Sequence, residues 1–294
     1  MKKLFCLLLC LLVLCGCTNN NANTDTDTTT AIDMSTVSSI ADLKGAKIAV
    51  QTDLHEELAK QVEDVEYQFY DNLDMSVTAV KTGIMDCAIM DQPIAYVYTM
   101  KDDSLAYVDF TNNVNGFTVS EADYANSAAF KKGNELRDEV EAIITSVDMD
   151  TYHELMNQIL VVSNGGELEN GFVLEYEEPT NPDGVLRVGM ECASEPFNWT
   201  DIDGASFGSV TIASGEGAGQ PCNGLDVQVA KYVAAKLNKT LEVYAIEWDS
   251  LLPALDAGTI DCIIGNMSPR EDRKVNYDFT SSYYDVDYVV LYNK

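Results

Sequence analysis

Short apolar runs rich in β-branched and aromatic residues alternate with segments of helical periodicity from residue 47 onward. Such alternation is typical of mostly parallel sheets joined by right-handed crossovers, so we predict an α/β fold with two sheets. The predicted strands are Lys47–Gln51, Tyr67–Tyr70, Cys87–Met90, Leu105–Val108 and Phe117–Val119, followed by Leu186–Met190, Leu241–Ile246 and Cys262–Gly265. The predicted helices are Glu56–Val65, Met75–Lys81, Ile94–Met100, Glu135–Ser146, Thr151–Leu160, Asp226–Leu237 and Ser250–Asp256.

One helix-to-strand unit occurs twice. The segment Ala79–Asp91 matches Ala254–Asn266 at five of thirteen positions, which include a glycine, an aspartate and a cysteine. In each copy we expect a helix that stops at the glycine and a buried strand that delivers a polar residue at its carboxyl end. Because ligands of open α/β sheets bind outside the carboxyl ends of strands, Asp91 and Asn266 are expected to face one cleft. Chance similarity between two such units is the alternative.

The N-terminus has the pattern of an export signal. Lys2 and Lys3 precede the apolar run Leu4–Leu14, which is too short to span a bilayer of about 30 Å as a helix. The run ends in Cys15-Gly16-Cys17, which resembles the cleavage box of bacterial lipoproteins. We therefore predict a lipoprotein signal peptide over residues 1–16 and acylation of Cys17; an ordinary secretory signal is the alternative. The Asn-, Thr- and Asp-rich residues 17–38 are predicted to be a flexible tether.

Composition narrows the classes of partner. The chain has 48 acidic and 18 basic residues, a formal net charge of −30. This charge argues against nucleic acid, whose binding depends on Lys and Arg, and anionic lipid surfaces should repel the protein as well. A lipid anchor would nevertheless hold it at the extracytoplasmic face of the cell membrane, because acyl chains contribute about 0.8 kcal/mol per buried CH₂.

The cysteines beyond the signal differ in their surroundings. Cys87 and Cys262 lie inside apolar runs and are expected in the core. Cys192 and Cys222 lie in loop-like sequence, and the spacing leaves open whether they form a disulfide.

A series of motifs connects the chain to a known family. In the part of the chain after Gly184 these motifs are Leu186–Met190, Pro196–Trp199, Gly224–Val227, Trp248–Leu255, Gly258–Asp261, Asn266–Arg273 and Tyr277–Phe279. With them, the segment Gly184–Tyr292 resembles the first lobe of the family 3 extracellular solute-binding proteins, the amino-acid receptors of ABC importers. Further motifs, Asp42–Gly45, Gly83–Asp91 and Ala129–Leu136, make Ile40–Leu160 similar to the other lobe. The resemblance implies a two-lobed, periplasmic-binding-protein-like (type II) α/β fold.

The order of the two lobes departs from the family, and a circular permutation would explain this. Residues 39–120 would form the second lobe, residues 121–184 the helices that return to the first lobe and a linker, and residues 185–294 the first lobe with the carboxylate-binding loop and a hinge strand. We expect Asp287–Tyr292 to be that hinge strand and to lie close to Ser38–Leu43. Gly165–Gly184 should be a surface connection, and Glu135–Ser146 and Thr151–Leu160 should pack on the lobe of Leu186.

By resemblance, the cleft holds an amino acid. Arg273 would bind the carboxylate, with Ser268 beside it and the backbone of Asn266 and Met267 in the same loop, and Asp91 would take the α-amino group. Both charges need partners because an unpaired charge is costly to desolvate. The alternatives are a solvated helix residue for Arg273 and a helix N-cap before Gln92-Pro93 for Asp91.

Other positions bear on the ligand side chain. Trp248 would offer an aromatic wall and Phe197 or Trp199 would close the entrance, with core packing as the alternative for Phe197 and Trp248. Glu191 lies at a position where some members of the family hold a cationic ligand side chain with an acid, so the resemblance weakly suggests a basic or polar ligand. Ser194 lies where an aromatic residue is common in the family. Thr52–His55 replaces the usual Gly-Thr-Thr turn, so His55 is either a substitute donor or a surface histidine.

Signals for enzymes are poor. Gly204–Gly208 fits G-x-S-x-G but lies in a Gly- and Ser-rich insertion, and both histidines precede it. Gly215–Gly219 lacks the Lys-Ser/Thr of a phosphate loop, and no zinc or calcium pattern occurs. We therefore predict no enzyme and no cofactor, but a monomeric lipoprotein that delivers a polar or basic amino acid to an ABC permease. A sensory or scaffold protein of the same fold is the main alternative, and an enzyme on this fold is a weaker one.

Overall fold

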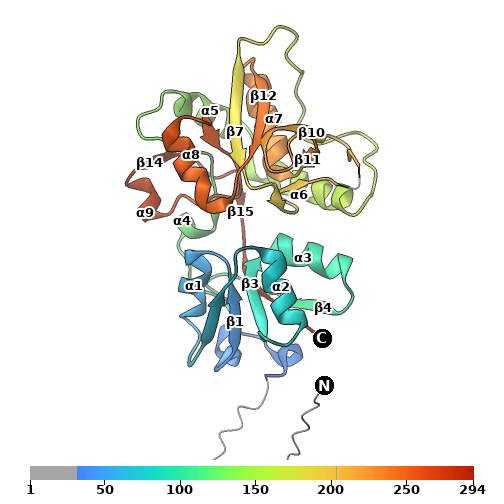
Figure 1. Cartoon of the computed structure of the whole chain (residues 1–294), viewed down its shortest axis with the longest axis vertical. Coiled ribbons are helices and arrows are strands. Elements are labelled where there is room, and N and C mark those ends of the chain that lie inside the picture. The colour runs from blue at the N-terminus through green and yellow to red at the C-terminus, as the bar shows by residue number, and fades with distance from the viewer. Residues whose placement is uncertain (1–31, 203) are drawn as a thin grey trace, which may run out of the picture. The chain divides into compact units, whose positions relative to one another are not determined.

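The structure is a computed structural model that describes residues 32–202 and 204–294 (Figure 1). The predicted signal peptide, Cys17 and most of the predicted tether lie outside the described residues. No helix in the described ranges is long and apolar enough to cross a membrane. The described body contains two large sheets, each with its own helices, and we name its parts after them: the five-stranded lobe and the nine-stranded lobe.

The five-stranded lobe has the strand order β2-β1-β3-β16-β4. Strand β1 pairs in parallel with β2 and β3, whereas β16 runs antiparallel between β3 and β4. Helices α1, α2 and α3 follow β1, β2 and β3, as the alternating pattern predicted. The elements are η1 Met34–Thr36, η2 Ile40–Leu43, β1 Lys47–Val50, α1 Asp53–Ala59, β2 Glu66–Phe69, α2 Leu73–Lys81, β3 Cys87–Asp91, α3 Gln92–Lys101, β4 Leu105–Val108 and β16 Tyr288–Asn293.

The nine-stranded lobe has the order β14-β6-β13-β7-β12-β10-β11-β9-β8. At its centre β7 pairs in parallel with β12 and β13. The elements are β6 Ala129–Lys131, α5 Leu136–Ile144, α6 Met149–Ser163, β7 Val185–Met190, β8 Ala193–Ser194, β9 Asn198–Thr200, β10 Val210–Gly215, β11 Pro221–Asn223, α7 Leu225–Lys236, β12 Thr240–Ala245, η3 Trp248–Ser250, α8 Leu251–Ala257, β13 Cys262–Ile263, α9 Glu271–Lys274 and β14 Tyr277–Phe279.

The chain passes between the lobes through two antiparallel segments. Strands β5 (Ala125–Asn126) and β15 (Tyr284–Asp285) pair with each other, after the short helix α4 (Glu121–Tyr124) and before β16 respectively. The last strand of the chain, β16, therefore completes the sheet formed by the first half. Helices α5 and α6 both contact α7 of the nine-stranded lobe, although they follow the other lobe in sequence.

The connection between α6 and β7 lies on the same lobe. The N–H of Asp183 donates to the carbonyl of Asn238 (2.7 Å), and the N–H of Val173 donates to the side chain of Gln158 on α6 (2.7 Å). Tyr176 stacks edge-on against Tyr232 of α7. These contacts agree with the expected position of the linker, while the proximity of the chain end to Ser38–Leu43 stays a prediction.

Two sequence-based expectations about elements were wrong. Phe117–Val119 is not a strand, because both backbone polar groups of Thr118 bond to the side-chain amide of Gln61 (2.8 and 2.9 Å) instead of a neighbouring strand. The helix expected over Glu56–Val65 ends at Ala59, and the chain then turns through Asp64, which has a positive φ of 58°. The strand β10 was missed because it lies in the Gly- and Ser-rich insertion.

The repeated unit is a repeat in structure as well. Gly83 follows the end of α2, and Gly258 is the C-cap of α8. Both adopt a φ of +74°, a left-handed conformation that favours glycine. Asp86 then accepts a hydrogen bond from the N–H of Lys47 in β1 (2.8 Å), and Asp261 accepts one from the N–H of Arg187 in β7 (2.9 Å). The same contact thus ties each copy to the parallel strand next to its own strand, β1 beside β3 and β7 beside β13.

Candidate functional site

The two copies of the repeated unit meet at their carboxyl ends. The side-chain amide of Asn266, just after β13, donates to the carboxylate of Asp91, the last residue of β3, at 2.6 Å. The amide oxygen of Asn266 accepts from the side chain of Asn126 in β5, also at 2.6 Å. Asn266 therefore links both lobes and one crossing segment, which confirms that Asp91 and Asn266 face each other.

A cavity of about 60 Å³ lies beside this contact. It is lined from both lobes, and its polar members include most of the residues expected at a ligand site. The lining residues are Gln51, Thr52, Leu54, His55, Leu73, Met90, Asp91, Ile94, Glu191, Ser194, Trp248, Asn266, Ser268, Arg273 and Tyr288. A groove of about 810 Å³ shares Leu73 and Ile94 with this cavity and is also lined by Trp199.

Arg273 forms the cationic end of the cavity. Its Nη1 donates to the carbonyl and to the hydroxyl of Ser268 (2.9 and 3.2 Å). The guanidinium lies 5.6 Å from the ring centroid of Trp248, a cation–π geometry. Burial lowers the pKa of Arg273, but an arginine stays protonated at neutral pH. Within the described part of the chain, only Nη1 of Arg273 donates a hydrogen bond. A fixed cation whose other N–H groups are available in a cavity is suited to a carboxylate.

Asp91 forms an anionic end. It occupies the N-cap position of α3, yet its side chain makes no capping hydrogen bond and is directed to Asn266 instead. The residue is 7% exposed, and burial raises the pKa of Asp91 to about 6 although the bond from Asn266 opposes the shift. A buried carboxylate of this kind gains most from a cationic partner.

Glu191 adds a second carboxylate. It follows β7 and accepts a hydrogen bond from the hydroxyl of Ser194 (2.9 Å), and burial raises the pKa of Glu191. The cavity thus contains two carboxylates and one guanidinium, Arg273.

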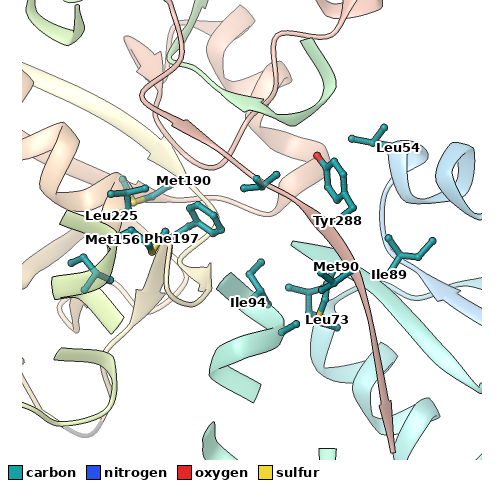
Figure 2. Packing of buried hydrophobic residues seen from close by; sticks show 14 of the residues in the cluster. Leu54, Leu73, Ile89, Met90, Ile94, Met156, Met190, Phe197, Leu225 and Tyr288 are labelled. Carbon is teal, nitrogen blue, oxygen red and sulfur yellow. The ribbon is translucent and has the colours of Figure 1, made fainter. Parts of the chain in front are cut away.

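Two residues expected at the ligand lie elsewhere. Phe197 is fully buried and packs edge-on against Tyr284, and Figure 2 shows it grouped with Met190, Leu225 and Met156. Met267 is buried in a small apolar cluster, and its carbonyl accepts from the N–H of Ser127 (3.0 Å). Neither side chain lines the cavity. Phe197 thus adopts the core packing that the sequence left open as its alternative, and the expected role of Met267, which concerned its backbone, stays a prediction.

His55 is buried, whereas the sequence left a surface position open for it. It is 7% exposed, so it is not a surface histidine, and it lines the cavity from the first turn of α1. Burial lowers the pKa of His55 to about 4. The signal was present in the sequence, since His55 shares a helix face with Leu58 and Ala59, both of which are buried.

Asp226 was not singled out by the sequence analysis. This fully buried residue of α7 accepts from the hydroxyl of Tyr283 (2.7 Å) and the amide of Asn198 (2.6 Å). Asn198 in turn accepts from the N–H of Cys192 (2.7 Å), next to Glu191. Burial raises the pKa of Asp226 to about 7 against the opposing hydrogen bonds. The residue holds the loop after β7 and the segment before β16 together.

Two ion pairs join the lobes outside the cavity. Arg270, before α9, pairs with Glu57 of α1 at 2.6 Å. On another element, Lys101 at the end of α3 pairs with Glu195, which also accepts from the hydroxyl of Ser163 (2.7 Å). Together with the Asn266–Asp91 bond, these contacts describe a conformation in which the lobes are closed on each other.

The described cysteines form no disulfide and no metal site. Cys87, Cys192, Cys222 and Cys262 are all buried free thiols, so the pairing of Cys192 with Cys222 that the sequence left open is not present. In residues 32–202 and 204–294, no group of three or more His, Cys, Asp or Glu side chains has an arrangement that could hold a metal ion.

Comparison with known proteins finds a similarity in the second half of the chain. Residues 186–294 match the model of the bacterial extracellular solute-binding proteins, family 3. The matched segment is less than half of the chain. The family consists of binding proteins and not of enzymes.

Individual relatives also match over only part of the chain. A probable histidine-binding protein of Neisseria gonorrhoeae is 32% identical over 114 residues, which are 39% of this chain and 37% of that protein. An arginine-binding extracellular protein of Bacillus subtilis is 32% identical over 71 residues, 24% of this chain and 28% of that protein. Each match therefore covers well under half of the relative's length.

One solved structure is similar over a share of this chain comparable to that of the relatives above. The L-cystine solute receptor of Neisseria gonorrhoeae, in its unliganded open conformation, is 28% identical over 33% of this chain and 35% of that chain, with a TM-score of 0.26.

Proposed function

We propose that this protein captures a polar or basic L-amino acid between its two lobes and delivers it to an ABC importer. The observation that carries the proposal is the cavity in which Arg273 and Ser268 of one lobe lie together with Asp91 of the other. A zwitterion satisfies both charges at once, whereas either charge alone would leave a buried ion unpaired. The printed names of the relatives, binding proteins for histidine, arginine and cystine, support a ligand of this class.

The charge of the cavity favours a cationic ligand side chain. An α-carboxylate pairs with Arg273 and an α-ammonium with Asp91, which leaves Glu191 without a charged partner. A basic side chain would supply that partner, and the ring of Trp248 would cover its aliphatic part. A neutral polar side chain would bind as well, with Glu191 protonated or hydrogen-bonded to Ser194.

We further propose that the protein is a monomeric lipoprotein, anchored through Cys17 at the extracytoplasmic face, and that its fold is a circular permutation of the family's. The permutation is supported by the position of the last strand, β16, in the sheet of the first half, and by the packing of α5 and α6 on the nine-stranded lobe. Residues 17–38 would let the body reach the permease while it stays attached.

A thermal-shift screen against the twenty L-amino acids tests the function. A ligand at one hundred times its Kd adds about 2.7 kcal/mol of stability, which is a rise of several degrees in Tm. Ligand that binds should also change the fluorescence of Trp248. The proposal fails if none of the twenty changes either signal, and that result would favour the alternative, a sensory or scaffold protein that has kept the fold without binding amino acids.

A further inference from the structure

One of the two ion pairs between the lobes lies next to the arginine of the cavity. Nη2 of Arg270 is 2.6 Å from a carboxylate oxygen of Glu57, which belongs to α1 of the five-stranded lobe. Arg270 is the residue before α9, and Arg273 lies three positions further along in the same lobe. Burial lowers the pKa of Arg273, and the positive charge of Arg270 lowers it further. The two guanidinium groups are therefore close enough to repel each other.

The guanidinium of Arg270 is already fixed by its own lobe. The side chain is 11% exposed, and its Nε donates to the carboxylate of Asp272 (3.2 Å). Its Nη1 is enclosed by protein. Many exposed ion pairs contribute little because two long side chains must be immobilised to form them. This cost is smaller here, since Glu57 is the only mobile member of the pair, with a side chain that is 56% exposed.

Helix α1 presents two carboxylates on one face. Asp53 and Glu57 are four positions apart in α1, the spacing at which side chains are neighbours on a helix surface. Glu57 pairs with Arg270, and the negative charge of Asp53 opposes the lowering of the pKa of Arg273. Two carboxylates of the five-stranded lobe thus lie near two guanidinium groups of the nine-stranded lobe. We call these four residues the α1–α9 clasp.

The clasp depends on the relative position of the lobes. Because α1 and α9 belong to different lobes, a movement that opens the cavity separates Glu57 from Arg270 and leaves the arginine with Asp272 alone. Neither Arg270 nor Glu57 lines the cavity, so neither contacts a molecule bound there. Figure 1 shows α1 and α9 on one side of the boundary between the lobes, and α3, which carries Lys101 of the second interlobe pair, on the other.

We propose that Arg270 and Glu57 are positioning residues that set how long the ligand stays in the cavity, because they hold α1 against α9 once the lobes have closed. The inference rests on the proposed function, since it assumes that an amino acid is bound between the lobes. A ligand carboxylate beside Arg273 adds a negative charge near both arginines, so the ligand and Glu57 favour the same closed state. Loss of the pair should speed release of the ligand and leave its encounter with the open lobes unchanged.

The test compares two neighbouring glutamates of α1. Glu57→Gln removes the charge and keeps the size of the side chain. Glu56→Gln is the matched control, because it makes the same change of charge but Glu56 pairs with Lys60 of its own lobe (2.7 Å). The probe is the L-amino acid with the largest shift in the screen, and stopped-flow tryptophan fluorescence gives its association and release rates. At about 20 mM salt, we expect Glu57→Gln to speed release about three- to fivefold and Glu56→Gln to change it less than about twofold. The association rate should change less than about twofold in both variants.

Salt distinguishes an ion pair from a general effect on the structure. At about 500 mM salt the Debye length falls to about 4 Å, so the release rates of Glu57→Gln and the unmodified protein should agree within about twofold. An unchanged release rate in Glu57→Gln, the same acceleration in Glu56→Gln, or an acceleration that salt does not diminish would overturn the inference while the proposed function stands. Failure of the unmodified protein to bind any of the twenty amino acids would instead remove the proposed function, and this inference with it.

Discussion

The two copies of the repeated unit are alike up to the end of the strand and differ directly beyond it. Both contain the left-handed glycine, the aspartate that bonds to the neighbouring parallel strand and a buried cysteine. The first copy ends in the carboxylate of Asp91 and continues at once into α3. The second ends in Asn266, with a positive φ of 53°, and continues through a loop to Ser268 and Arg273. One scaffold therefore supplies both the anionic and the cationic half of a site, and the difference lies in the residues after the strand.

The first prediction concerns the cationic half of the candidate site. Arg273→Ala should weaken amino-acid binding by at least about thirtyfold, because truncating one partner of a buried charge pair costs about 2–5 kcal/mol. Calorimetric titration measures the change. Lys274→Ala is the matched control, since the half-buried Lys274 pairs with Glu271 on the same helix and does not line the cavity. Unchanged affinity in Arg273→Ala would exclude this residue as the carboxylate contact.

The second test concerns the scaffold that the copies share. Asp261 accepts from the backbone N–H and from Nε and Nη2 of Arg187, whereas Asp86 accepts from the backbone N–H of Lys47. We expect Asp261→Ala to lower the free energy of unfolding by about 1.5–3 kcal/mol and Asp86→Ala by about 0.5–1.5 kcal/mol. Urea unfolding of both variants gives the comparison. Equal losses would mean that the ion pair with Arg187 adds nothing to the shared contact.

The third test concerns pH and the nine-stranded lobe alone. The pKa of Asp226 is raised to about 7, while in the unfolded chain an aspartate ionises near 4. Between these values the unfolded state releases its proton first, so this residue makes stability fall as pH rises, by at most about 1.4 kcal/mol per pH unit. In Asp226→Asn, the free energy of unfolding between pH 4 and 7 should therefore depend less steeply on pH. An unchanged slope would show that Asp226 is ionised in the folded protein across this range.

Much of the scaffold followed from the sequence, because period-two and period-3.6 patterns record which face of an element is buried. Examples of elements predicted in this way are the strand Leu105–Val108 and the helix ends at Gly83 and Gly258. The missed strand β10 and the wrong strand at Phe117–Val119 depend on partners that are distant in sequence, such as Gln61 for Thr118. Local pattern does not contain that information.

The site was predictable where chemistry and position coincide. Arg273, Asp91, Ser268, Asn266, Trp248, Glu191 and Ser194 all line the cavity, whereas Phe197 and Met267 do not. For Phe197 the sequence left core packing open as the alternative, and the residue is fully buried; an aromatic residue near a cleft has the same sequence signal whether it points in or out. His55 was left between two roles although it shares a helix face with the buried Leu58 and Ala59. Its contact with the ring of Tyr288, which is 233 positions away in the chain, could not be predicted from local sequence.

The most direct measurement is a crystal structure of the protein with the amino acid that binds most tightly in the screen. The account predicts that the ligand lies in the cavity between the lobes, with its carboxylate on Arg273 and Ser268 and its ammonium within hydrogen-bond distance of Asp91. It also predicts that the Asn266–Asp91 contact between the repeated units is kept or bridged by the ligand. A ligand bound in the groove lined by Trp199, or bound with no contact to Arg273 and Asp91, would contradict the account.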